Sequence, residues 1–476
     1  MSDGVAFVST NPATGEVVWQ GNAGSESQID QAVVAARDAL DRWADAPLNA
    51  RTGYLEAFAE QLKQHKQDLA EAICRETGKP RWEALAEVDA MIGKVAISIL
   101  AYHERRRETS SEAAGVLSAT RYKPFGVMAV IGPFNMPGHL PNGHIVPALL
   151  AGNTVIFKPS ELTPLVGQKM AELWSAPNLP KGVFQIVQGG RETGAALVRH
   201  PGIDGVLFTG SVAGGLAISR TLLDQPGKIV ALEMGGNNPL VVWGAADLDA
   251  AAYLIIQSAF ITAGQRCSCA RRLIIPNDAR GDAIIEHLTA MMQKIRVGPY
   301  TAQQEPFMGP VITDGAAESL LGAQEHLIER GAKTLFAMRT IGPTKAMLSP
   351  GLIDVTNVSD RPDVEFFGPM LQVIRVADFD AAIIEANNTK FGLAAGLLSD
   401  DVKLWERFYR RTRAGVVYFN RQTTGGSSAL PFGGTGLSGN HRPSGYFAAD
   451  YCSYPVASME SPKLAMPEKR SLGIDL

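Results

Sequence analysis

Five short apolar runs between residues 126 and 232 constrain the fold more than any other feature of this sequence. They span 126–131, 154–157, 183–187, 205–208 and 229–232, and the gaps between them are long enough to hold helices. A run that is apolar throughout is typical of a strand buried on both faces, and strands that alternate with helices form a parallel sheet. The sequence therefore predicts an α/β fold with a five-stranded parallel sheet, in which ligands bind beyond the carboxyl ends of the strands.

A second α/β region follows this sheet. Strands are expected at 239–243, 272–276, 371–376, 392–398 and 415–420, with helices at 247–262, 282–295, 381–386 and 402–411. Ahead of both regions, three apolar stripes at helical spacing predict three amphipathic helices as the first elements, to which we assign no chemistry. These stripes fall within 29–43, 55–62 and 85–99. Residues 107–125 are expected to be an extended excursion, and 446–459 an edge strand that can pair with another chain.

Composition excludes several classes of protein. A chain of 476 residues predicts two or three domains, and a net charge of -4 gives no basic field for nucleic acid. No apolar run approaches the roughly 18–20 residues of a membrane span, and the first ten residues lack the pattern of a signal peptide. Four cysteines in so long a chain do not form a disulfide framework. We therefore expect a cytoplasmic protein without nucleic-acid or membrane partners.

Polar residues come directly after the first two runs. Asn135 follows the first, between two prolines, and its side-chain amide can donate to a developing oxyanion. The alternative is a turn asparagine that bonds its own backbone. Lys158 and Glu161 follow the second run and suit hydrogen bonding to ribose hydroxyls, although a routine loop has the same composition.

The fourth and fifth runs are also followed by candidate ligand residues. Gly210 to Gly215 lead into a helix whose N-terminus attracts a pyrophosphate, but their spacing is not the usual Gly-x-Gly-x-x-Gly of dinucleotide sites. Glu233 ends the fifth run, where burial of an unpaired carboxylate is costly and raises its pKa. A general base fits that position, and a glutamate paired with a basic neighbour is the alternative.

Cys267 is the candidate nucleophile. Small residues surround it, an apolar helical run precedes it, and Arg266, Arg271 and Arg272 lie nearby in sequence. Positive charge favours thiolate over thiol. The competing interpretation is an inert cysteine packed in a core.

Taken in order, these motifs resemble those of the NAD(P)-dependent aldehyde dehydrogenase superfamily. The resemblance covers the chain from Asn11 almost to its end, and two further motifs, Phe366-Phe367-Gly368-Pro369 and Pro431-Phe432-Gly433-Gly434, continue it. It implies a Rossmann-like NAD-binding domain at 1–106 and 126–234 and an α/β catalytic domain at 235–436. A small β oligomerisation arm at 107–125 and 437–476 would complete the architecture and form a homodimer or a dimer of dimers.

The resemblance also implies a role for each motif. Cys267 would attack the aldehyde and pass through a thiohemiacetal to a thioester, Asn135 and the Cys267 N–H would hold the oxyanion, and Glu233 would activate the hydrolytic water. No metal is required. NAD is expected rather than NADP, because a carboxylate at Glu161 would repel a 2′-phosphate. The residues implied in cofactor binding are Lys158, Glu161, Gly210, Ser211, Val212, Ala213, Gly214, Gly215, Glu365 and Phe367.

A finer resemblance points to one subfamily. Residues 138–147, 267–272 and 438–444 are similar to the dehydrogenases that oxidise N-succinylglutamate 5-semialdehyde in bacterial arginine catabolism by the succinyltransferase route. This substrate carries two carboxylates, which forked donors such as arginine bind well. Arg421, His441 and Arg442 are the candidates, with exposed surface charge as the alternative.

Three other activities compete with this interpretation. Another semialdehyde dehydrogenase, hydrolytic or CoA-acylating, would keep the fold, although Glu233 argues for hydrolysis. A binding protein on a retired enzyme fold and a cysteine hydrolase are the remaining alternatives.

Overall fold

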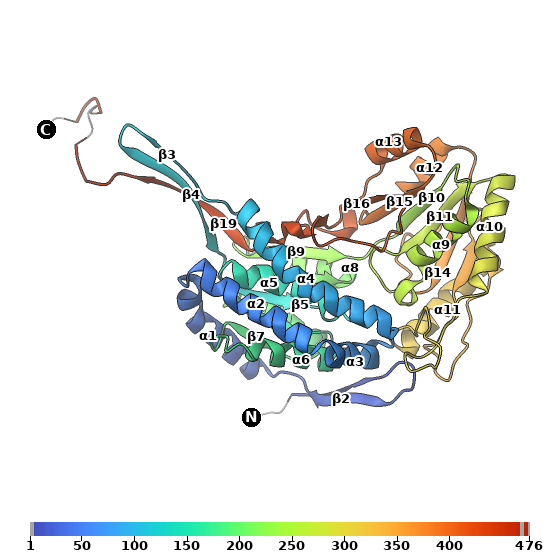
Figure 1. Ribbon diagram of the computed structural model, residues 1–476, viewed down its shortest axis with the longest axis horizontal. Coiled ribbons are helices and arrows are strands. Elements are labelled where there is room, and N and C mark those ends of the chain that lie inside the picture. Colours follow the sequence, from blue (N-terminus) through green and yellow to red (C-terminus); the bar gives the residue numbers. More distant parts are fainter. Residues whose placement is uncertain (1–3, 467–470, 475–476) are drawn as a thin grey trace.

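Two largely parallel sheets flanked by helices form the body of the molecule, and a thin β arm projects from it (Figure 1). The computed structural model describes residues 4–466 and 471–474. The expected α/β class is therefore confirmed, and the candidate site residues all lie within the described part of the chain.

The first sheet has the strand order β7-β6-β5-β8-β9, with every neighbouring pair parallel. Its central strands are buried along their whole length, as their unbroken apolar runs predicted. The prediction of five parallel strands is confirmed. The strands are β5 (Val127–Ile131), β6 (Thr154–Lys158), β7 (Phe184–Ile186), β8 (Gly205–Gly210) and β9 (Ile229–Met234), and the helices between them are α5 (His139–Leu150), α6 (Pro164–Ser175), α7 (Arg191–Arg199) and α8 (Val212–Thr221).

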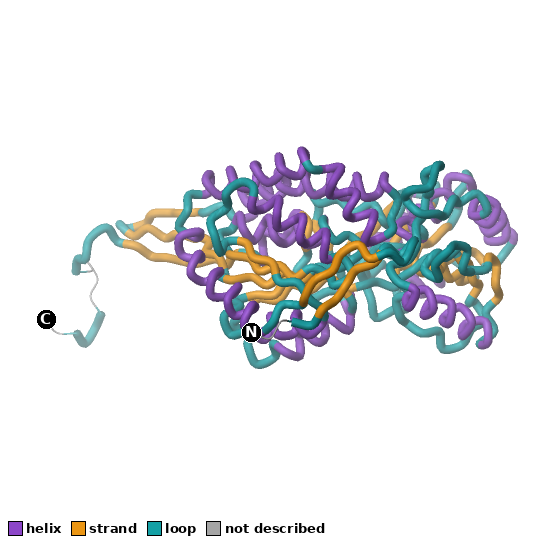
Figure 2. The backbone as a smooth tube through the Cα atoms, turned by 90° about the horizontal axis from the view of Figure 1, so that it is seen from below, coloured by secondary structure: helices purple, strands orange, loops and turns teal. Residues whose placement is uncertain are grey.

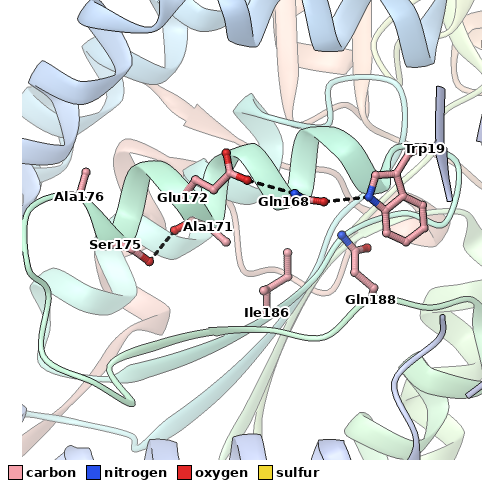
Figure 3. A pocket seen from close by; sticks show the side chains of 8 residues that line it. All are labelled: Trp19, Gln168, Ala171, Glu172, Ser175, Ala176, Ile186 and Gln188. Carbon is pink, nitrogen blue, oxygen red and sulfur yellow. Dashed lines mark hydrogen bonds between the residues drawn. The ribbon is translucent and has the colours of Figure 1, made fainter. Parts of the chain in front are cut away.

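The prediction that three helices come first is wrong in two respects. An antiparallel hairpin, β1 (Ala6–Thr10) and β2 (Val17–Asn22), precedes them, and its strands are too short and too exposed to show an apolar pattern. Trp19 of this hairpin donates to Gln168 on α6 at 2.9 Å, beside a surface groove (Figure 3). Four helices then follow instead of three: α1 (Glu26–Ala44), α2 (Leu48–Gln64), α3 (Lys66–Thr77) and α4 (Arg81–Arg105).

Helix α3 was not predicted because only His65 separates it from α2, so the apolar patterns of the two helices merge into one amphipathic stretch of sequence. The signal that marks its end is Gly78, which caps the helix with φ +70. A glycine in the left-handed region is a common helix terminator.

The second sheet has seven strands in the order β12-β13-β14-β11-β10-β15-β16 and is parallel except for the pair β12–β13. The five strands expected from the sequence are confirmed. The two that were missed have only four residues each, and β12 is partly exposed. The strands are β10 (Asn238–Val242), β11 (Ala270–Pro276), β12 (Lys333–Phe336), β13 (Gly351–Asp354), β14 (Met370–Val376), β15 (Ala394–Leu398) and β16 (Val416–Phe419). The helices are α9 (Leu248–Ala259), η1 (Ile261–Gly264), α10 (Ala279–Met292), α11 (Asp314–Glu329), α12 (Phe379–Ala386) and α13 (Val402–Arg411).

The arm is a three-stranded antiparallel sheet of order β19-β4-β3, built from β3 (Thr109–Ala113), β4 (Val116–Pro124) and β19 (Ser453–Glu460). Figures 1 and 2 show it extending away from the body. The expected excursion at 107–125 is thus extended. The strand expected at 446–459 begins only at Ser453, because η3 (Tyr446–Tyr451) comes first.

Between β16 and η3 the chain forms three short elements, β17 (Pro431–Phe432), η2 (Gly436–Ser438) and β18 (Ser444–Gly445), of which β17 and β18 pair antiparallel. The last part of the arm expected at 437–476 lies partly outside the described residues. Within the range that the structure describes, no helix combines the length and the apolarity needed to cross a membrane.

Candidate active site

A cavity of about 610 Å³ opens at the carboxyl ends of the first sheet, where the sequence places its polar motifs. Asn135, Glu233 and Cys267 all line it, although they come from three separate segments of the chain. The segment after β5 supplies Asn135, the end of β9 supplies Glu233, and the turn between η1 and β11 supplies Cys267. The structure therefore brings the three predicted catalytic residues together.

The segment ahead of Cys267 is strained. Thr262, Ala263 and Gly264 have φ values of 54, 51 and 70 in succession, a left-handed conformation that costs on the order of 1 kcal/mol or more for each residue with a side chain. Gly264 must be glycine for a second reason, because a Cβ there would lie 2.1 Å from the carbonyl oxygen of Gly368. Surrounding contacts thus hold this turn in place, and it leaves Cys267 partly exposed on the cavity wall.

The charge around Cys267 differs from the sequence expectation. Burial raises the pKa of the Cys267 thiol, as do the neighbouring carboxylates of Glu233 and Glu365, while Arg271 lowers it. The prediction that three arginines favour the thiolate is wrong for the other two, because their side chains are bonded elsewhere. Arg266 donates to Thr262 at 2.8 Å and to a buried glutamate.

Arg272 turns away in the same manner. Its guanidinium donates to the backbone oxygens of Asn237, Glu385 and Ala386, at 2.9, 2.7 and 3.0 Å. The residue is 4% exposed and holds the segment just ahead of β10 against the end of α12. Proximity in sequence to a cysteine therefore does not decide where an arginine's charge acts.

Glu233 has the environment of a general base. The residue is 4% exposed, and burial raises the pKa of its carboxyl group to about 7, opposed by a hydrogen bond from Ser444 and by the charge of Lys94. The Ser444 N–H donates to Glu233 Oε1 at 3.2 Å. The alternative of direct salt-bridge pairing is not seen among the described residues. A carboxylate that titrates near neutral pH can take a proton from water at physiological pH.

Asn135 is 6% exposed and bonds the cysteine segment, not its own turn. Its Nδ2 donates to the carbonyl oxygen of Gln265 at 2.8 Å, and Lys79 Nζ donates to its backbone oxygen at 2.6 Å. A side-chain amide has two N–H donors, and the second has no partner among the described residues, while Asn135 itself lines the cavity. That donor is suited to an oxyanion that forms beside Cys267.

The rest of the cavity wall fits a dinucleotide. Lys158 is 4% exposed, donates to the backbone oxygens of Pro159 and Gly189 at 2.6 Å each, and lies 3.7 Å from Glu161. Two of the three protons of the Lys158 ammonium therefore have backbone acceptors. The third proton and the half-exposed carboxylate of Glu161 are available to a polar ligand such as a ribose. Ser211 caps helix α8, accepting from Gly214 N at 3.2 Å, and the cavity reaches this helix N-terminus.

Most of the predicted cofactor residues line the cavity, and two do not. Val212 packs against the core of the first sheet, and Gly215 faces the Met234 side chain, because successive helical residues point in different directions. The residues on the wall are Lys158, Glu161, Gly210, Ser211, Ala213, Gly214, Glu365 and Phe367.

Glu365 and Phe367 reach the cavity from the segment just ahead of β14 of the second sheet. Arg271 Nη2 lies 3.5 Å from Glu365 Oε1, and burial raises the pKa of that carboxyl group. A Cβ on Gly235 would lie 1.7 Å from Glu365 Oε2, so only glycine admits this approach. The Phe367 ring meets Phe134 edge-on at 5.9 Å. Contacts with neighbouring residues thus hold both side chains in place on the cavity wall.

The predicted substrate residues lie elsewhere. Arg421, His441 and Arg442 are exposed, and none of them lines the cavity. Arg442 makes one hydrogen bond in the described structure, to the His441 backbone oxygen at 3.3 Å.

Sequence reasoning missed Tyr418, whose pKa is raised to about 12 by burial and by the charge of Cys267. Its hydroxyl has no partner among the described residues. Nothing distinguishes this tyrosine from other aromatic residues in a predicted strand.

The remaining cysteines are free thiols buried in the core: Cys74, Cys269 and Cys452. Cys269 lies two positions from the candidate nucleophile but is 0% exposed, as a packed neighbour would be. Across the described ranges, no group of three or more His, Cys, Asp or Glu residues is arranged to hold a metal ion.

A partly exposed cysteine, a buried glutamate and a side-chain amide donor line one cavity at the end of a parallel sheet. This combination is typical of cysteine-dependent enzymes that act on carbonyl groups. The chain belongs to the aldehyde dehydrogenase family, whose model matches residues 1–455. N-succinylglutamate 5-semialdehyde dehydrogenase of Pseudomonas fluorescens is 54% identical over 473 residues, 99% of this chain and 97% of the relative.

Solved structures agree with this assignment. The chain is similar to 1-pyrroline-5-carboxylate dehydrogenase from Thermus with bound NAD, at 30% identity and a TM-score of 0.90, over 96% of this chain and 90% of that one. It is also similar to NADP-dependent glyceraldehyde-3-phosphate dehydrogenase from Bacillus halodurans complexed with NADP. That match has 29% identity and a TM-score of 0.88, and covers 96% of each chain.

Proposed function

We propose that this protein oxidises N-succinylglutamate 5-semialdehyde to N-succinylglutamate with NAD⁺ and water, in arginine degradation by the succinyltransferase route. The observation that carries the proposal is the 54% identity over nearly the whole chain to a dehydrogenase of that name. The reaction consumes the aldehyde, NAD⁺ and water and releases the acid, NADH and protons.

In the proposed mechanism, the Cys267 thiol releases its proton to solvent, the thiolate attacks the aldehyde carbon, and the carbonyl oxygen becomes an oxyanion. The free Nδ2–H of Asn135 and the Cys267 N–H stabilise this oxyanion. A bound nicotinamide dinucleotide would supply the acceptor for the hydride that the former aldehyde carbon loses, so that a thioester remains on Cys267. Glu233 then takes a proton from water, which attacks the thioester and releases the acid. The placement of all three residues on one cavity wall supports this assignment.

We further propose that the cofactor is NAD and not NADP. Lys158 and Glu161 would hold the ribose, Gly210, Ser211, Ala213 and Gly214 the pyrophosphate, and Glu365 and Phe367 the nicotinamide ribose. The Glu161 carboxylate disfavours a 2′-phosphate by like-charge repulsion. Glu161→Gln should therefore raise kcat/KM with NADP relative to NAD. Comparable kcat/KM values for both cofactors in the unaltered enzyme would rule out the preference.

The experiment that tests the substrate is a turnover screen. N-succinylglutamate semialdehyde is compared with succinate, glutamate and betaine semialdehydes, each with and without CoA. The proposal expects the highest kcat/KM with the first compound and no dependence on CoA. A higher value with another semialdehyde would reassign the substrate, and a requirement for CoA would reassign the thioester acceptor and remove the hydrolytic role of Glu233.

The three-part organisation predicted from the sequence implies an oligomer formed through the arm. The outer strands β3 and β19 have no further strand neighbour in the described structure, and such edges pair readily with another chain. We propose a homodimer or a dimer of dimers, located in the cytoplasm, where Cys267 stays reduced. Analytical ultracentrifugation tests the assembly, and a monomer at all concentrations would contradict it.

A further inference from the structure

Helix α4 carries an unexpected line of buried charge. Glu83, Glu87 and Lys94 are 2%, 1% and 1% exposed, and their spacings of four and seven positions place them on one face of the helix. Charged side chains are rarely buried so completely unless they are paired, and an apolar replacement of a buried ion pair often stabilises a protein. In the sequence, only the apolar residues of this helix form a recognisable pattern, and that pattern predicts no chemistry.

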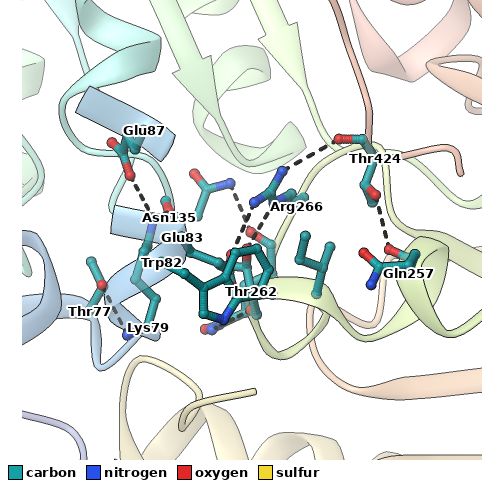
Figure 4. Close-up of polar contacts among 12 residues, drawn as sticks. Thr77, Lys79, Trp82, Glu83, Glu87, Asn135, Gln257, Thr262, Arg266 and Thr424 are labelled. Atoms are coloured by element: carbon teal, nitrogen blue, oxygen red, sulfur yellow. Dashed lines mark hydrogen bonds and ion pairs between the residues drawn. The ribbon is translucent and has the colours of Figure 1, made fainter. Parts of the chain in front are cut away.

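Glu83 holds the strained turn that carries the cysteine. Its carboxylate accepts hydrogen bonds from the backbone N–H and the hydroxyl of Thr262, the first of the left-handed residues, with the N–H at 3.1 Å. It also pairs with Arg266 at 3.0 Å (Figure 4). One carboxylate thus fixes residues on both sides of Gly264, just ahead of Cys267, and offsets part of the cost of that conformation.

Glu87 holds the segment that carries Asn135. One carboxylate oxygen accepts from the N–H groups of Gly138 and His139, at 2.9 and 3.1 Å. The other pairs with Lys79 Nζ at 2.7 Å, and the same ammonium donates to the Asn135 backbone oxygen at 2.6 Å (Figure 4). The loop around Asn135 is therefore fastened to α4 at three backbone atoms.

Lys94 holds the segment beside Glu233. Its ammonium donates to the Gly445 backbone oxygen at 2.7 Å, and the preceding residue, Ser444, donates to the Glu233 carboxylate. The charge of Lys94 also acts directly on Glu233, since it opposes the effect of burial on that carboxyl group. Lys94 thus supports the proposed base both through the backbone and through its charge.

We propose that the charged face of α4, formed by Glu83, Glu87 and Lys94, is a template that sets the relative positions of the three catalytic segments. Each of these residues is a positioning residue for a different part of the reaction. Glu83 acts on the nucleophile, Glu87 on the oxyanion donor and Lys94 on the hydrolytic base. The inference rests on the proposed function, because it takes the roles of Cys267, Asn135 and Glu233 from it.

The template predicts that its three residues affect separable steps. A misplacement of about 1 Å in a catalytic group can cost about a hundredfold in rate. Lys94→Met should leave the first-turnover burst of NADH intact and slow steady-state turnover about tenfold to a hundredfold, because only hydrolysis needs the ionised carboxylate of Glu233. Glu87→Gln should slow the burst itself by a similar factor, since it acts on the oxyanion donor.

Glu83→Gln should slow two measurements, the burst and the alkylation of Cys267 by iodoacetamide in the absence of aldehyde. A displaced oxyanion donor leaves alkylation unchanged, so this assay separates Glu83→Gln from Glu87→Gln. Asp89→Asn is the matched control, because Asp89 lies on the same helix but is exposed and pairs with Lys66 at 2.7 Å. It should leave burst, turnover and alkylation unchanged.

The experiment is stopped-flow NADH formation by the full-length enzyme, with N-succinylglutamate semialdehyde and with propanal as a neutral probe. Thermal unfolding and NAD binding of each variant show whether the protein remains folded. If the unaltered enzyme forms no NADH with either aldehyde, the proposed function fails. If it does turn over, but the variants slow burst and turnover by one common factor, or change neither, the template is refuted. A burst that Lys94→Met retains, as the control Asp89→Asn does, and that Glu83→Gln and Glu87→Gln lose supports it.

Discussion

The buried Glu233 should couple catalysis to stability. The pKa of its carboxyl group rises from the ordinary value of 4.5 to about 7 because the site is desolvated. Each tenfold change in an acid dissociation constant corresponds to about 1.4 kcal/mol, so ionising this group in the folded protein costs about 3 kcal/mol relative to the unfolded chain. The desolvated site therefore gives Glu233 the pKa of a base suited to neutral pH, and the folded protein is less stable as a result.

The sign of the pH dependence follows from the direction of this change. A carboxyl group whose pKa is raised by folding leaves stability intact below its unfolded value and lowers it as the pH rises toward the folded value. Glu233→Gln removes this penalty, since the amide does not ionise. We expect the stability of the variant relative to that of the unaltered protein to rise by about 2.5 kcal/mol from pH 5 to pH 8.5, while hydrolysis of the thioester becomes very slow.

Chemical denaturation of both proteins at pH 5, 7 and 8.5 measures the gain as a difference. The comparison matters because Glu76 also has a pKa raised to about 7 by burial, and its contribution cancels between the two proteins. In parallel, steady-state turnover of the unaltered enzyme should rise about tenfold from pH 6 to pH 8 where hydrolysis is limiting. A stability difference that is constant across this range would refute the reasoning, because Glu233 would then titrate at its ordinary value.

Three further perturbations test the site. Cys267→Ser should abolish NADH formation and retain NAD binding by calorimetry; residual turnover near that of the unaltered enzyme would exclude Cys267 as the nucleophile. Gly264→Ala should destabilise the protein by more than about 1 kcal/mol in denaturant, because its φ is +70 and a Cβ would lie 2.1 Å from the Gly368 oxygen; an unchanged midpoint would show that the turn can relax. Arg442→Ala should leave KM for the dianionic semialdehyde and for propanal unchanged, because Arg442 is exposed and does not line the cavity; a KM raised for the dianion alone would show that Arg442 binds the substrate.

The strand-end residues could be predicted from sequence because their signal is local. Asn135, Lys158 and Glu233 each follow an apolar run directly, and the rule that parallel strands end at one edge of a sheet brings them together. The same kind of local pattern, a short apolar run, also predicts the main strands of both sheets. It failed at β1 and β12, because short and partly exposed strands carry no apolar pattern.

The contacts that hold the site together could not be predicted in this way. Glu83 meets Thr262 across 179 positions, and Lys94 meets Gly445 across 351. A charged residue in an amphipathic helix is assigned to solvent by default, and only the folded structure shows which face is buried. The buried face of α4 therefore contains apolar residues, which the sequence pattern predicts, and charged residues, which it does not.

The electrostatics of Cys267 show the same dependence on the fold. The sequence places three arginines near this cysteine, but two of them form hydrogen bonds to other partners. Two carboxylates, those of Glu233 and Glu365, line the same cavity as Cys267. Because an ionised Glu233 raises the pKa of the thiol, the thiolate is least costly when Glu233 carries the proton. Hydrolysis needs the opposite state, with Glu233 ionised and Cys267 occupied as an uncharged thioester. The attack and the hydrolysis therefore use the same two groups in opposite protonation states, and the cavity never needs to hold both negative charges at once.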